Sequence, residues 1–107
     1  MSGQYILVDR EPVAEPDLLT WARWMERDRD ARHVAETTIG PSRVSTLFLG
    51  FDHALSGPRR ILFETMIFGG PEDGYQARYS TWAEAEAGHA KAVDRILQRP
   101  TRLYGED

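Results

Sequence analysis

The chain has 107 residues, 41% hydrophobic and 28% charged, which is the composition of one folded domain and excludes a disordered or fibrous protein. Its formal charge of −4 argues against general binding to nucleic acids or to membrane surfaces. The absence of cysteine excludes disulfides, thiolate zinc sites and cysteine nucleophiles. No secretory signal is visible, and no apolar run approaches the roughly 20 residues that span a bilayer, so we expect a cytoplasmic protein.

The N-terminal part of the chain predicts a strand, a turn and an amphipathic helix. Residues 5–8 form a short apolar run, and Val13 can begin a return strand at a sheet edge. Asp17 is suited to cap a helix that ends near Asp30. Four side chains of this helix recur at helical spacing and are expected to face the core: Leu18, Trp21, Ala22 and Met25.

The middle of the chain predicts three strands. Residues 32–39 are rich in β-branched side chains, and residues 43–51 and 61–68 are strongly apolar. The Ser56-Gly57-Pro58 sequence between the last two runs is typical of a turn and predicts a β-hairpin. A pairing that is symmetric about this connector brings three pairs opposite each other: Phe51 with Leu62, Leu49 with Glu64, and Leu47 with Met66.

The C-terminal third predicts a short strand over residues 75–79 and then the clearest helix. Thr81 and Glu84 have the spacing of a capping box, and Pro100 is expected to end the helix. The inner face of this helix is predicted from side chains three or four residues apart: Trp82, Ala85, His89, Ala92, Val93 and Ile96.

This order of elements predicts one α+β domain over residues 1–107, with loose termini at residues 1–4 and 100–107. We expect an antiparallel sheet of about four to five strands with two amphipathic helices packed on it. No internal repeat, linker or low-complexity tract indicates a second domain.

The candidates for chemistry lie in the predicted hairpin, where Asp52 and His53 close one strand and Glu64 interrupts the other. A carboxylate in an apolar run is either paired or functional, because an isolated buried charge is costly. Asp52 or His53 could reach Glu64 across the hairpin and form an acid-base pair or bind a divalent cation. In the structural alternative, Asp52 caps the turn, His53 is partly exposed, and Glu64 pairs with Arg23 or Arg78. No spacing typical of metal ligands or of a cofactor motif supports a metal or cofactor site.

Two further features have both structural and functional interpretations. His89 on the inner face of the last helix is more typical of a semi-buried structural residue than of a ligand. Trp21, Trp24 and Arg27 can stack bases or anchor a protein partner, although tryptophans at this spacing also lock a helix to a sheet.

Four segments together resemble a family of small accessory proteins of tailed bacteriophages and prophages: residues 15–27, 44–53, 62–74 and 79–93. The resemblance covers the chain from Tyr5 to Val93 and brings with it no catalytic residue. It implies a phage accessory protein made in the bacterial cytoplasm. The excess of arginine, with 12 Arg against one Lys, is compatible with a phage of a GC-rich host.

From this resemblance we expect a protein that binds and inhibits a host protein, such as a CRISPR-Cas or other nuclease component of antiviral defence. Four acidic side chains are then expected to face a basic surface of that partner: Glu72, Asp73, Glu84 and Glu86. One alternative is a small metal-dependent or acid-base hydrolase that uses Asp52, His53 and Glu64. Another is a structural or assembly component of the phage particle. An exposed hairpin edge would also permit homodimerisation by strand pairing.

Overall fold

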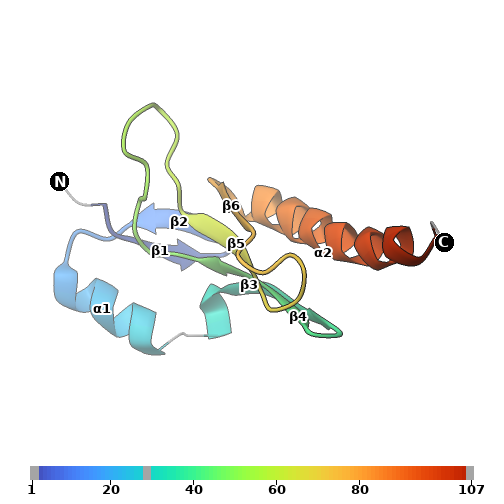
Figure 1. The fold of residues 1–107 in the computed structure, drawn as a ribbon. Helices are drawn as coiled ribbons and strands as arrows, with labels where there is room; N and C mark the ends of the chain where they lie inside the picture. The colour runs from blue at the N-terminus through green and yellow to red at the C-terminus, as the bar shows by residue number, and fades with distance from the viewer. Residues whose placement is uncertain (1–2, 28–29, 106–107) are drawn as a thin grey trace.

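The computed structural model describes residues 3–27 and 30–105, with side chains up to residue 98, and has the α+β fold that the sequence predicts (Figure 1). The predictions for residues 1–2 and 106–107 lie outside the described residues. None of the helices in the described ranges has the length and hydropathy of a membrane-spanning segment. The elements follow one another in this order: β1 (Tyr5–Val8), β2 (Glu11–Ala14), α1 (Leu18–Arg27), the 3-10 turn η1 (Asp30–Arg32), β3 (His33–Ile39), β4 (Ser42–Phe48), β5 (Phe63–Phe68), β6 (Gln76–Tyr79) and α2 (Trp82–Gly105).

The strands form a four-stranded antiparallel meander in the order β3-β4-β5-β6 and a separate hairpin of β1 and β2. The hairpin is joined to the end of β4, because the N–H of Tyr5 donates to the carbonyl oxygen of Gly50 at 2.9 Å. An isolated bridge between Gln4 and Phe51 extends this contact. The side-chain amide of Gln4 also donates to the carbonyl oxygen of Glu15, so this residue of the predicted loose terminus is held in place.

The register of the central hairpin differs by two residues from the symmetric pairing that the sequence predicts. Leu47, and not Leu49, lies opposite Glu64. Beyond this pair, the chain after β4 turns toward the N-terminal hairpin, where the N–H of Asp52 donates to the carbonyl oxygen of Gly3. The residues between Leu49 and His53 therefore pair with the start of the chain and not with β5, which makes the connector asymmetric.

The two faces of the four-stranded sheet have different surroundings. Helix α2 packs on one face, where three fully buried side chains of β4 lie directly opposite three of β5: Val44, Thr46, Phe48, Phe63, Thr65 and Ile67. The predicted inner face of α2 is confirmed, since Ala85, Ala92 and Ile96 are buried against these strands. On the opposite face, no helix of the described part of the chain covers β4 and β5.

Helix α1 begins as predicted, because the carboxylate of Asp17 accepts hydrogen bonds from the N–H and hydroxyl of Thr20. The prediction of its inner face is partly wrong. The buried residue is Trp24, whose ring meets Phe48 edge-on at 5.9 Å, while Leu18 is 59% exposed. The spacing pattern did not predict this face because neighbouring sides of the short helix make different contacts: Trp24 meets Phe48, whereas Trp21 and Met25 lie against Gly50.

Helix α2 is longer than the sequence predicts, since it continues through Pro100 to Gly105. A proline removes one backbone donor and kinks or weakens a helix, but does not have to end it. The helix therefore extends past the end of the sheet, away from α1 and the N-terminus (Figure 1).

The close approach of α2 to β6 depends on Gly88. A methyl group at this position would collide with the ring and hydroxyl of Tyr79. We predict that Gly88→Ala lowers the free energy of unfolding by about 1–3 kcal/mol, the usual cost of overpacking, although alanine is the better helix former. Chemical denaturation measures this change.

The control for this prediction is the same substitution in a Tyr79→Ala background. Without the ring, Gly88→Ala should become stabilising by up to about 1 kcal/mol, because only the helix propensity remains. A stabilising effect of Gly88→Ala in the wild-type chain would contradict the steric explanation.

Candidate functional site

The connection between β4 and β5 is a long loop that projects from the sheet (Figure 1), and Asp52 closes its base. Oδ1 of Asp52 accepts hydrogen bonds from the N–H of Ala54 at 2.9 Å and from the N–H of Ile61 at 3.0 Å. The N–H of His53 donates to the carbonyl oxygen of Ile61, also at the base. The hydrogen bonds from Ile61 and Ala54 hold the pKa of Asp52 below its usual value, so the carboxylate is charged at neutral pH.

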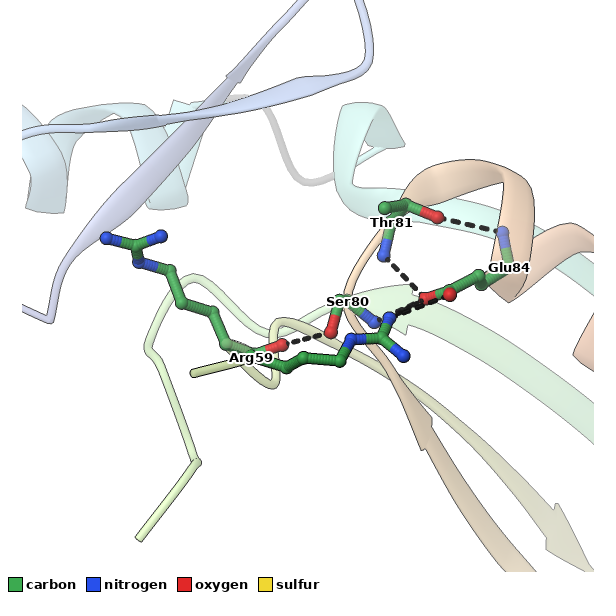
Figure 2. A network of polar contacts seen from close by, with 5 residues as sticks. Arg59, Ser80, Thr81 and Glu84 are labelled. Carbon is green, nitrogen blue, oxygen red and sulfur yellow. Dashed lines mark hydrogen bonds and ion pairs between the residues drawn. The ribbon is translucent and has the colours of Figure 1, made fainter. Parts of the chain in front are cut away.

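The descending arm of the loop is fixed to the start of α2 (Figure 2). Nη2 of Arg59 lies 2.6 and 2.7 Å from the two carboxylate oxygens of Glu84. The hydroxyl of Ser80 donates to the carbonyl oxygen of Arg60, whose guanidinium lies over the ring of Tyr5 at 5.4 Å. The loop is therefore held by its base and by one arm.

Glu84 also forms the capping box that the sequence predicts. Its carboxylate accepts hydrogen bonds from the N–H groups of Ser80 and Thr81, while the hydroxyl of Thr81 accepts one from the N–H of Glu84 (Figure 2). Arg59, followed by these N–H groups, lowers the pKa of Glu84. One carboxylate thus joins the loop to the first turn of the long helix.

At the base of the loop lies an exposed apolar surface, which we call the Trp21 surface: Leu18, Trp21 and Phe51. The indole N–H of Trp21 donates to the carbonyl oxygen of Gly50 at 3.1 Å, and its ring lies 4.8 Å from that of Phe51. Leu18 is one helical turn before Trp21 and so shares its face. Leu18 and Phe51 are 59% and 44% exposed, so the rings are held firmly while much apolar area faces solvent.

The position of the Trp21 surface depends on Gly50. This residue has a φ of +83°, and a Cβ here would lie 2.6 Å from the terminal methyl of Met25. Only glycine combines this backbone conformation with so close an approach of α1. The same bend directs the following Phe51 toward Trp21 and the chain onward into the loop.

The tip of the loop carries a second exposed apolar group. Leu55 is fully exposed, and every residue from 55 to 60 is exposed. Leu55 therefore adds one large apolar side chain to the solvent-exposed surface of this loop. The loop lies on the half of the molecule that also carries α1 and the N-terminal strands (Figure 1).

The structure separates the three side chains proposed for hydrolysis. Asp52 and His53 lie at the base of the loop, whereas Glu64 lies on the sheet face away from α2, where its carboxylate is 2.9 Å from Nε of Arg78. Asp52 is hydrogen-bonded to the N–H of Ile61, three residues before Glu64, which corresponds to about 10 Å along an extended strand. No group of three or more His, Asp or Glu side chains in the described ranges could hold a metal ion. The pairing with Arg78 is the structural alternative considered from the sequence.

Three of the four acidic residues proposed to face a partner interact within the chain. Glu72 pairs with Arg95 at 2.9 Å, and Asp73 accepts a hydrogen bond from the N–H of Gly69 at 2.6 Å. Glu84 belongs to the capping box already described. Glu86 is exposed on α2. The carboxylates of Glu72, Asp73 and Glu84 thus stabilise the loops and the helix start of this chain.

A shallow groove of about 360 Å³ lies between β6 and the first half of α2, beside the Arg59–Glu84 pair. Its cations are Arg59, Arg78 and Lys91. Both arginines are already paired with carboxylates, and Lys91 makes no ion pair with a described residue. The groove therefore has only a small excess of positive charge, which does not select a strongly anionic ligand.

His89 lies beneath α2 at the centre of a chain of hydrogen bonds. Its Nε2 is 2.9 Å from Oγ1 of Thr37, and its Nδ1 is 2.7 Å from Oγ1 of Thr46. The Thr46 hydroxyl is 2.5 Å from that of Thr65, which accepts a hydrogen bond from Tyr79. Donation in one direction, from Tyr79 toward Thr37, satisfies every group if His89 is neutral and protonated on Nε2. This arrangement supports the structural interpretation of His89.

No protein-family model matches the sequence, and no curated protein or solved structure matches the chain. The surface features of the described residues therefore carry the functional argument. Sequence reasoning identified Trp21 but missed Phe51 and Leu55. Phe51 is the last residue of a predicted strand, and Leu55 lies in the connector that follows. At such positions an apolar residue gives the same sequence pattern whether it is buried or exposed.

Burial lowers the pKa of His89, against a smaller opposing effect of Glu36. A His whose pKa is lowered by folding binds a proton more readily in the unfolded state, so stability falls as pH decreases below about 6.5, the unperturbed value. We predict a lower free energy of unfolding at pH 5.5 than at pH 7.5 in urea titrations.

The matched variants for this prediction are His89→Gln and His53→Gln. The slope of stability against pH between these values should flatten in His89→Gln, and His53→Gln, which replaces an exposed histidine, serves as the control. An unchanged slope in His89→Gln would show that other groups cause the dependence.

Proposed function

We propose that this chain is a phage accessory protein that acts by binding a host protein, and that the Trp21 surface and the tip of the β4–β5 loop form the contact. The observation that supports binding most directly is the exposure of Leu18 and Phe51 around a half-buried Trp21, together with the full exposure of Leu55 on the nearby loop. Aromatic and apolar side chains of this kind dominate the binding energy of protein interfaces.

The anchoring of the loop supports the same proposal. Asp52 closes the base, and the Arg59–Glu84 pair holds one arm, so the unbound loop is already restricted (Figure 2). Restriction before binding lowers the entropy lost when a partner docks. The polar residues first considered for catalysis would then serve to present Leu55.

The proposed partner is a component of host antiviral defence, such as a nuclease complex, as the sequence resemblance implies. We place the main contact on apolar side chains and not on the acidic set, because Glu72, Asp73 and Glu84 interact within the chain. The partner is therefore expected to offer an apolar groove wide enough for a leucine and an aromatic ring. Glu86 remains exposed for a contact with a basic rim.

The test is an affinity capture from host lysate with the wild-type chain and two surface variants, followed by titration of the recovered partner. We predict that Leu18→Asp and Leu55→Asp each weaken binding by about 10- to 100-fold, as expected for a charge placed in an apolar contact. Leu97→Asp is the matched control, because Leu97 is 53% exposed on α2, away from the proposed contact.

If all three variants bind a recovered partner with the same affinity, the proposed contact is contradicted. Recovery of no stoichiometric partner by the wild-type chain would contradict host-protein binding itself. Presence of the chain in purified virions would favour a structural or assembly role.

A further inference from the structure

The face of the four-stranded sheet that α2 leaves uncovered carries an orderly set of side chains. We call it the open sheet face and define it by the outward residues of the central strands: Arg43, Ser45 and Leu47 of β4, and Glu64, Met66 and Phe68 of β5. The register places these residues in rows, with Arg43 opposite Phe68, Ser45 opposite Met66, and Leu47 opposite Glu64. The solvated face of an antiparallel sheet is usually polar, so the apolar members require an explanation.

The apolar members form a continuous strip across the middle of the face. Leu47, Met66 and Phe68 line a small hollow of about 40 Å³ together with Ser45 and Glu64. Phe68 is 40% exposed, and the guanidinium of Arg43 lies over its ring at 4.6 Å. Methionine, aromatic side chains and arginine are the residue types enriched in protein interfaces.

The charges on this face balance on both sides of the strip. Toward β3, Nη1 of Arg43 lies 3.2 Å from the carboxylate of Glu36. Toward β6, Nε of Arg78 lies 2.9 Å from the carboxylate of Glu64. The face is thus neutral on a chain whose formal charge is −4, and it would give a strongly charged partner no favourable field.

We propose that the open sheet face is a self-association surface, on which the same face of a second copy of this chain docks. In a two-fold arrangement each copy presents the same apolar strip and both signs of charge to the other. The two ion pairs of one copy then lie against the same ion pairs of the other copy, which run in the opposite direction. No unpaired charge has to be buried. This inference does not depend on the proposed host partner, whose contact lies on the Trp21 surface.

The area of the open sheet face sets the expected affinity of self-association. Four strands of about six residues cover roughly 19 by 20 Å, which is about half of the ~800 Å² that each partner of a standard interface buries. Association is therefore expected to be weak and to depend on concentration.

Sedimentation equilibrium of the purified chain from micromolar to millimolar concentration tests this inference. We predict a rise from monomer toward dimer mass for the wild-type chain, and a dissociation constant at least about tenfold higher for Met66→Lys, because a charged ammonium group would replace an apolar side chain in the contact. The control is Ala90→Lys, which adds the same charge at an exposed position on α2. Phe68→Ser provides a second variant that adds no charge, with circular dichroism to confirm that each variant is folded.

A chain that stays monomeric over the whole range would overturn the inference. So would a dimer that persists in both Met66→Lys and Phe68→Ser, which would point to pairing of strand edges. A dimer lost in Leu18→Asp but kept in Met66→Lys would assign self-association to the Trp21 surface and would equally overturn it.

Discussion

The packing of α2 on one face of the four-stranded sheet is the contact on which the rest of the structure depends. Without this helix, most of the sheet face that it covers would be exposed to solvent. The residues in contact between α2 and the sheet are both apolar and polar. The polar part is the chain of hydroxyl groups that ends on His89, which is satisfied only when helix and sheet are in register. Gly88 allows the closest approach, next to the ring of Tyr79. Hydrogen bonds and close shape complementarity thus fix the position of α2 on the sheet, while burial of apolar area provides the driving force for the packing.

The local elements were predictable from the sequence because their signals are local. The capping box of Thr81 and Glu84 and the helical spacing that includes His89 predicted the start and inner face of α2. The register of β4 against β5 was not predictable from the hairpin alone, because the chain after β4 also pairs with the start of the chain, where the N–H of Asp52 donates to the carbonyl oxygen of Gly3. The exposure of Phe51 was missed for the same reason. Alternation shows which residues share a face, but not whether another element covers it.

The candidate catalytic residues have structural explanations that differ from one residue to the next. Asp52 closes a loop, and Glu64 pairs with Arg78. By contrast, several large apolar side chains, with Leu55 the most exposed, remain in contact with solvent. Exposed leucine and aromatic groups that lie together are the kind of side chain that dominates the binding energy of protein interfaces. This contrast between internal polar contacts and exposed apolar groups supports the proposal of an accessory protein that docks on another protein.

The most direct test of this account is site-specific photocrosslinking in infected host cells. A photoreactive phenylalanine analogue replaces Leu55 at the tip of the loop in one variant and Leu97 on α2 in the other. The account predicts one covalent adduct of defined mass from position 55 and none from position 97, since only the first lies in the proposed contact. The absence of an adduct at position 55, or the same adduct from both positions, would contradict it.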